Sequence, residues 1–468
     1  MNNGFLLRAA MATAIALPLT GCGLAPAGST ITAAPVATVP QHPATLSGIV
    51  HGGQQPVTSG SVYLLAAGTT GNYGPSTSLL NTAAGGVSTD LNGDGYVVTD
   101  SNGYFTLTGD YTCPTANTEV YAAAVGGNPG LGGSSYNFNL TMMAALGPCG
   151  NLTSASFISI NELTTVAAVW ALGPFMTDLF DIGTSVNNPN GIVNAFAAAS
   201  ELANSSAGTL PGLALPAGAV LPSSKINTLA DILAACINSN GGSAGDGSAC
   251  GNLFAAATQG SNQAPQDTVA AALSIEQSPT LHPASLFALA QASPPFQPAL
   301  GAAPTDWTLT VQYTAGGFNN PRSIAIDAQG NAWIANCGSA NCTTNGAGSI
   351  TELSPLGAPV ATPYTAGGIN IPVSIAIDAL GDAWIANQGG NSVTELTSAG
   401  VPVVAAYTGG GLSAPSSIAI DGLGNVWITN SGNSSVTEIS GAGSVLSPSG
   451  GFTGGGVSAP IAIVTSPH

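Results

Sequence analysis

Basic residues are nearly absent from this chain. Of its 468 residues only Arg8, Lys225 and Arg322 are basic, against 21 acidic residues, so the formal net charge is −18. Nucleic acids and anionic lipid surfaces are bound through clustered Lys and Arg side chains. The composition therefore excludes nucleic acid as a partner.

Histidine is scarce as well. The chain has four His residues, and none lies between Trp307 and Pro467. Histidine is the usual general base near neutral pH, so the C-terminal third offers no evident catalytic base. Charged residues make up only 5% of the chain, but hydrophobic residues make up 44% and follow regular periods. We therefore expect folded, β-rich domains rather than disorder.

The first 22 residues predict a targeting segment. An apolar run ends in Leu19-Thr20-Gly21-Cys22, which resembles a bacterial lipoprotein signal with Cys22 as the lipidated residue. An ordinary signal peptide or a weak membrane helix is the alternative. The resemblance implies an exported protein attached by lipid to the outer membrane or cell surface, because Gly23 is not the Asp that retains lipoproteins in the inner membrane. Residues 23–43 are rich in Pro, Ala, Thr and Ser, which predicts a flexible tether.

Cysteine usage agrees with export. Six cysteines remain after Cys22, and they form three couples that are close in sequence: Cys113 with Cys149, Cys236 with Cys250, and Cys337 with Cys342. An even set in an exported chain indicates disulfides. A metal site would need clustered Cys and His, and no His lies near any couple.

Residues 44–150 alternate apolar and polar side chains in short segments between Gly, Asn and Pro turns, which predicts a β-sandwich. The segment also resembles the carboxypeptidase regulatory-like domain, which implies a non-catalytic spacer or adhesive module. A long insert between Leu65 and Val97 departs from the shortest members of that family. The residues that carry the resemblance are Gly48, Val50, Gly52, Pro56, Val62, Leu64, Thr99, Asp100, Gly103, Tyr104 and Phe105.

The insert contains the segment Asp90-Leu91-Asn92-Gly93-Asp94-Gly95. Oxygen-bearing side chains at alternate positions and a Gly at the turn match the first half of a calcium loop. Position 12 of that loop, normally Glu, is Ser101, and Asp100 could substitute for it. The sequence thus leaves two alternatives: no cofactor and an ordinary Asp-rich turn, or calcium held by Asp90, Asn92, Asp94 and Asp100.

Residues 155–300 change to helical patterns, which predicts a small all-α domain. We expect helices at about 161–172, 190–203, 224–238, 250–258, 266–277 and 283–292. Asn161, Ser224 and Asp267 are the expected N-caps.

A repeat occupies residues 301–468. The pattern Ile-Ala-Ile-Asp begins at Ile324, Ile375 and Ile418, and a broken copy begins at Ile461, so the steps are 51, 43 and 43 residues. Repeats of this length built from short strands predict β-propeller blades, here about three full blades and a partial one. Trp307–Val311 resembles a last strand and Ile461–Val464 a first strand, so the two fragments could share a blade. An open arc, or closure by a second chain or by the helical domain, is the alternative.

The repeat resembles NHL-type units and the blades of streptogramin lyase (virginiamycin B lyase)-like propellers. The matching residues of the first unit are Pro321, Asp327, Gly330, Asn331, Trp333 and Asn336. The resemblance implies the fold, but the lyases carry a catalytic His and a metal-binding acid, and this segment has no His. We therefore expect a chain without enzymatic activity, with a propeller lyase or hydrolase as the alternative.

Three sets of side chains recur once per unit. Asp327, Asp378 and Asp421 are expected to accept hydrogen bonds from turn N–H groups. Glu352, Glu395 and Glu438 are expected to be solvated strand residues, or a ring that binds a cation. Trp333, Trp384 and Trp427 could stack on sugars, but their repetition favours packing between blades.

The sequence thus predicts a multidomain chain: a signal peptide (1–22), a tether (23–43), a β-sandwich (44–150), an α-helical domain (155–300) and propeller-type repeats (301–468). The function that fits best is a lipid-anchored, non-enzymatic binding or scaffold protein of the cell envelope. Its expected partners are the membrane, through the lipid anchor, and a protein or glycan ligand. Self-association is expected if the propeller is incomplete.

Overall fold

The computed structural model describes residues 44–53, 55–108, 111–132, 135–290, 294–343 and 348–465. The expected signal peptide, the lipidated Cys22 and the tether lie outside these residues. None of the described helices combines the length and apolar character needed to cross a membrane.

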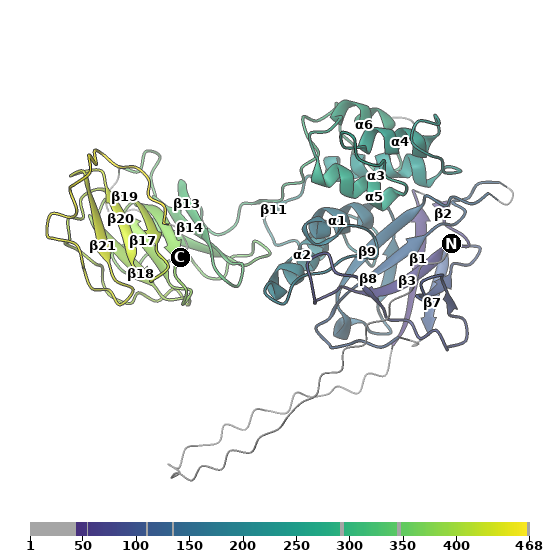
Figure 1. The fold of residues 1–468 in the computed structure, drawn as a ribbon, viewed down its shortest axis with the longest axis horizontal. Helices are drawn as coiled ribbons and strands as arrows, with labels where there is room; N and C mark the ends of the chain where they lie inside the picture. Colours follow the sequence, from purple (N-terminus) through teal and green to yellow (C-terminus); the bar gives the residue numbers. More distant parts are fainter. Residues whose placement is uncertain are drawn as a thin grey trace, which may run out of the picture. The chain divides into compact units, whose positions relative to one another are not determined.

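Two sheets form the N-terminal part (Figure 1). The first has β1 (Thr45–Gly52) paired antiparallel with β2 (Gln55–Pro56) and β7 (Tyr104–Thr108), and parallel with β10 (Phe157–Ile160). The second runs in the order β5 (Ser88–Thr89), β6 (Gly95–Val98), β3 (Ser61–Ala66), β8 (Glu119–Val125), β9 (Thr141–Pro148), with β4 (Thr77–Ser78) also on β3. Burial alternates along β1, as its sequence predicts for a half-covered strand.

Helices make up much of the remainder of the N-terminal part. Within the described ranges they are α1 (Glu162–Leu172), α2 (Pro189–Leu202), α3 (Ser223–Ile237), α4 (Ala249–Ala257), α5 (Thr268–Gln277) and α6 (Pro283–Leu289), with 3-10 turns η1 (Cys149–Asn151) and η2 (Gly173–Phe175). The side chain of Asn161 accepts a hydrogen bond from Thr164 N and that of Asp267 from Ala270 N, so these two N-caps are confirmed. Ser224 is not a cap, because α3 begins one residue earlier and follows Pro222.

The expected boundary between a β-sandwich and a separate helical domain is not found. Strand β10 lies beyond that boundary and completes the first sheet, and α1, α2 and α5 pack on β9 (Figure 1). Buried apolar residues from Leu46 to Trp307 form one cluster, which we call the N-terminal core. The physical reason is that β8 and the first half of β9 are buried on both faces, so this sheet needs a helical cover.

The three expected cysteine couples are disulfides in the structure. Cys113–Cys149 joins the segment before β8 to the end of β9, Cys236–Cys250 joins α3 to α4, and Cys337–Cys342 closes the loop that lengthens the first repeat.

The repeat region contains three antiparallel sheets of three strands. The first unit has β13 (Pro321–Ile326), β14 (Ala332–Asn336) and β15 (Ser349–Leu353). The second has β16 (Pro372–Ile377), β17 (Ala383–Asn387) and β18 (Ser392–Leu396), and the third has β19 (Pro415–Ile420), β20 (Val426–Asn430) and β21 (Ser435–Ile439). The expected fourth strand is reduced to isolated bridges, such as Ile350 with Tyr364. A short pair, β11 (Ala219–Val220) with β12 (Gln312–Tyr313), precedes the repeats.

The sheets of the described residues pair into no closed ring, and the predicted shared blade is wrong. Trp307 is fully buried in the N-terminal core, where its carbonyl accepts the indole N–H of Trp170 at 3.0 Å. Residues 461–464 are not assigned to a strand. Ile463, rather than Ile461, donates its N–H to Ser417 Oγ (3.3 Å), so the terminal segment lies two residues out of the repeat register.

Candidate functional site

The recurring aspartates organise the turn and the tryptophan of each unit. Asp378 Oδ1 accepts the backbone N–H groups of Leu380 and Asp382, and its Oδ2 accepts the indole N–H of Trp384 at 3.0 Å. Asp327 and Asp421 make the same three kinds of bond in their units. The expected turn role is therefore confirmed, whereas the indole bond was not predicted.

The tryptophans of the first two units are packing residues. Trp333 and Trp384 are fully buried, and each stacks on the tyrosine of its own unit, Trp333 on Tyr364 at 5.7 Å and Trp384 on Tyr407 at 5.3 Å between ring centroids. The following unit covers them, so neither can stack on a sugar. Trp427 differs: it is half-buried, and no further three-stranded unit packs on it among the described residues.

The recurring glutamates pair with tyrosines instead of forming a ring. Tyr364 donates its hydroxyl to Glu352 Oε2 at 2.7 Å, and Tyr407 donates to Glu395. Burial raises the pKa of both carboxyl groups. In the third unit Phe452 takes the place of the tyrosine and has no hydroxyl to offer Glu438. No acidic group found among the described residues joins two of the three glutamates, so the expected cation ring is not formed.

One acidic group is present in the second unit. Carboxylate oxygens of Asp378, Asp382 and Glu395 lie within 4.8 Å of one another. The first and third units have Asn331 and Asn425 where this unit has Asp382, and each Asn donates its side-chain N–H to the turn aspartate, at 2.9 and 3.3 Å. Sequence reasoning missed this difference, although the change from Asn to Asp within an otherwise repeated turn was the available signal.

The residues predicted to hold calcium are divided between two turns. Asp90 Oδ1 accepts the N–H groups of Asn92 and Asp94, and Asp100 Oδ1 accepts those of Asn102 and Tyr104. Among the described residues Asp90, Asp94 and Asp100 form no common carboxylate group. The geometry is that of two Asp-stabilised turns, each of which uses its own carboxylate.

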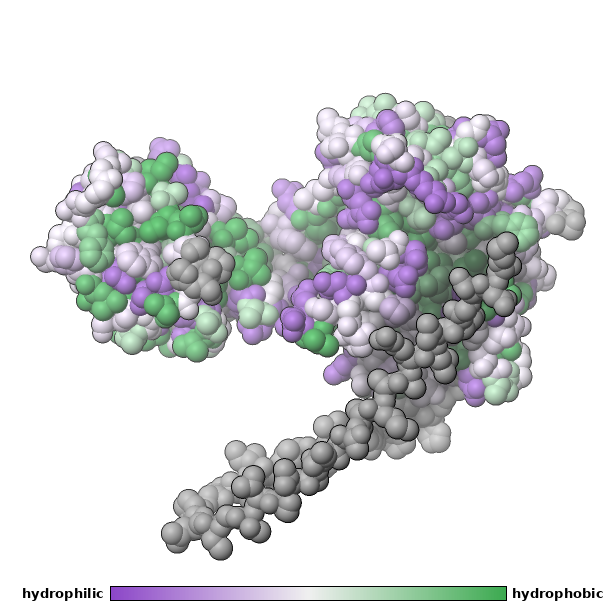
Figure 2. All heavy atoms as spheres, in the orientation of Figure 1, coloured by the Kyte–Doolittle hydropathy of each residue, from purple (hydrophilic) through white to green (hydrophobic). Residues whose placement is uncertain are grey.

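The repeat region has an uncovered end. We define the front face of a unit as the surface of its first strand that meets the preceding unit. On this face Ile375 and Ile418 are 5% and 6% exposed, because each packs against the unit before it. In the first unit Ile324 and Ile326 are 62% and 59% exposed. Apolar residues are visible among pale and polar ones on the repeat region in Figure 2.

No family model matches this chain, and no curated protein does. Among the solved structures that resemble part of it is the virginiamycin B lyase of Staphylococcus aureus, which is 20% identical over 29% of this chain and 43% of the lyase, with a TM-score of 0.24. Another is a streptogramin B lyase, which is 18% identical over 32% of this chain and 47% of the lyase, with a TM-score of 0.25. A third is regucalcin, a calcium-binding protein of Agrobacterium tumefaciens, which is 19% identical over 27% of this chain and 44% of regucalcin, with a TM-score of 0.22. The chain thus matches less than half the length of each of these propeller proteins, and likeness at this level indicates nothing about activity.

Proposed function

We propose that this chain is a non-enzymatic scaffold of the cell envelope, anchored by lipid at the outer membrane or cell surface, whose repeat units form its interaction surface. The observation that carries the proposal is the exposed front face of the first unit, at Ile324 and Ile326. The same face is buried in the two later units, where it provides the contact that holds neighbouring units together.

The partner proposed for this face is a second copy of the chain. Inside one chain each front face covers the tryptophan of the preceding unit, as Ile375 covers Trp333. The third unit leaves its own tryptophan, Trp427, half-buried, and Ile461 and Val464 of the terminal segment are exposed. One copy therefore offers the front face that another copy lacks, so two copies joined head to tail could continue the series and close it.

The recurring acids support a non-enzymatic role over a lyase or hydrolase. Each turn aspartate is committed to its own turn and tryptophan, and Glu352 and Glu395 are committed to tyrosines. A general base needs a free acceptor placed beside a substrate, and these carboxylates already accept hydrogen bonds from the protein.

The test of the scaffold proposal is the oligomeric state of the mature chain, prepared with Cys22→Ser so that no lipid is attached. Light scattering after gel filtration should find a dimer that Ile324→Asp with Ile326→Asp converts to a monomer of unchanged melting temperature. The matched control is Leu380→Asp with Leu423→Asp, because these leucines are more exposed still but lie in turns. A native chain that is monomeric at all soluble concentrations, or a control that dissociates equally, contradicts the proposal.

The lipid anchor is tested separately, in cells. Cys22→Ser should move the full-length protein from the membrane fraction to the soluble fraction, because the thioether carrying the lipid cannot form. Ser29→Cys in the Cys22→Ser background is the control, since it restores a thiol outside the signal motif. Membrane partitioning that is unchanged by Cys22→Ser means that residues 1–22 are not a lipoprotein signal.

A further inference from the structure

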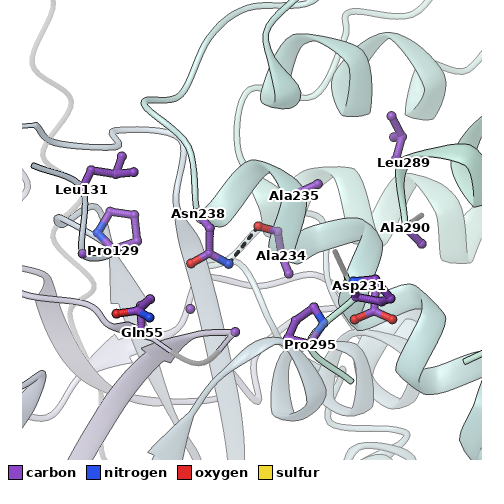
Figure 3. Close-up of a pocket in the computed structure, with 14 residues that line it drawn as sticks. Gln55, Pro129, Leu131, Asp231, Ala234, Ala235, Asn238, Leu289, Ala290 and Pro295 are labelled. Atoms are coloured by element: carbon purple, nitrogen blue, oxygen red, sulfur yellow. Dashed lines mark hydrogen bonds between the residues drawn. The ribbon is translucent and has the colours of Figure 1, made fainter. Parts of the chain in front are cut away.

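A cleft of about 800 Å³ opens in the N-terminal part, between the C-terminal half of α3, the end of α6, the residues Gly52, Gly53 and Gln55, and the loop at residues 129–131 (Figure 3). Its volume suits a small organic ligand. Small residues leave this space open, among them Gly53, Gly130, Ala234 and Ala235, and larger apolar side chains from Leu131, Leu289 and Pro295 line it.

Two hydrogen-bond acceptors in this cleft have no donor among the described residues. Asp231 is 3% exposed; its Oδ1 accepts Phe296 N–H at 2.9 Å, while its buried Oδ2 accepts nothing. Asn238 lies two helical turns further along α3 and donates to Ala234 O at 3.0 Å, which leaves its buried Oδ1 without a donor. Both residues line the cleft.

A second carboxyl group adds negative charge next to the cleft. Glu162, at the start of α1, is fully buried; its Oε1 accepts the N–H of the lining residue Gly53 at 2.7 Å and its Oε2 has no donor. Burial raises the pKa of Asp231 to about 7 and that of Glu162 to about 8. The negative charge of Asp231 further raises the pKa of Glu162.

The described basic residues do not neutralise this site. Lys225 pairs with Asp306 at 3.4 Å, and Arg322 donates to Cys342 Sγ at 2.8 Å. A buried acceptor without a donor costs free energy, and a buried carboxylate without a cation costs more. A ligand that brings both N–H donors and a positive charge would remove both costs.

We propose that this cleft binds a small organic cation made of a primary ammonium group on an apolar body. The ammonium pairs with the carboxylate of Asp231, and the apolar body lies against Leu131, Leu289 and Pro295. A quaternary ammonium fits less well, because it has no N–H to donate and none of the described lining residues is aromatic. This site is independent of the scaffold proposed for the repeats.

The experiment uses hexylammonium as the probe, titrated calorimetrically into the mature chain at about pH 8.5, where a carboxyl with a pKa of about 7 is ionised and an alkylamine is still protonated. Asp231→Asn should weaken binding by roughly tenfold or more, because a charge-assisted hydrogen bond is lost while the amide can still accept Phe296 N–H. Ala235→Leu should weaken binding, because the larger side chain narrows the cleft beside the apolar body of the probe. The control is Asp246→Asn, the same change at an exposed carboxylate outside the cleft.

Three results would overturn the proposal. The first is native affinity in Asp231→Asn, and the second is equal affinity for hexanol, which has the apolar body but no positive charge. The third is calcium that binds in competition with the probe and depends on Asp231, which would make the cleft a metal site. Because Asp231→Asn relieves a buried charge, the variant is expected to fold, and its melting temperature is measured alongside.

Discussion

Asp382 is the residue at which the second repeat unit departs from its neighbours. It places a third carboxylate beside Asp378 and Glu395, where the other units have an asparagine that donates a hydrogen bond to the turn aspartate. The substitution removes that hydrogen bond and adds a third negative charge to the group, while Asp382 Oδ1 accepts Ser398 N–H at 3.0 Å.

Asp382→Asn should therefore stabilise the protein by about 1 kcal/mol, the usual size of one restored hydrogen bond. The measurement is chemical denaturation of the native chain and the variant at neutral pH, with and without added calcium. Asn331→Asp is the converse control and should destabilise. If calcium stabilises the native chain and not the variant, the three carboxylates hold a cation and the repulsion argument fails.

At the scale of single residues, the sequence predicted chemistry that is local and missed chemistry that depends on packing. The turn role of Asp378 follows from the Gly-containing turn after it, so it could be predicted. The bond from Trp384 to Asp378 and the burial of Asp231 could not, because both depend on which face of an element is covered. A charged residue inside the apolar helix segment TLADILAA was the one available signal for Asp231.

At the scale of elements, the junctions between repeat units bury the apolar clusters of the repeat region that contain its tryptophans. Trp384 is fully buried between the second and third units, packs near Ile418 and Ile428, and hydrogen-bonds Asp378. Trp427 occupies the same place at the end of the series and is half-buried.

Trp384→Ala should cost about 3–5 kcal/mol of unfolding free energy, the usual range for truncation of a buried tryptophan. Trp427→Ala is the matched control and should cost clearly less, because less apolar surface is lost. Denaturant titration of the two variants checks this order. Equal losses would mean that the end of the series is covered as fully as its middle.

The elements themselves were predicted better than their grouping. The strands of the three units and all six helices lie near their expected residues, because each repeats a period that its own sequence carries. The domain boundary and the shared blade were wrong, because both depend on contacts between distant segments: β10 with β1, and Trp307 with the N-terminal core. The uncovered front face follows from the same cause, since no periodicity reveals whether a neighbour is present.

At the scale of the whole molecule, the shortage of basic residues has an energetic consequence. Glu162, Asp231 and Glu119 are all at most 6% exposed, and each has a carboxylate oxygen without a donor among the described residues. Burial raises their pKa values to about 8, 7 and 7. In a chain with more lysine and arginine, such carboxylates would commonly be paired.

We therefore expect the protein to be more stable in mild acid than in mild base. A carboxyl whose pKa is raised by folding binds its proton more tightly in the folded state, so its contribution is complete below the unfolded pKa of about 4.5 and is lost as the pH rises through about 8. For the fully buried Glu162 the loss is on the order of 2–5 kcal/mol.

Denaturant titrations between about pH 5 and pH 8.5 measure how the free energy of unfolding changes with pH. Glu162→Gln should flatten this slope while keeping the hydrogen bond from Gly53 N–H. Glu438→Gln, the same substitution at a half-buried position, is the control. A native chain whose stability rises over this range would contradict the raised pKa values of these buried carboxyl groups.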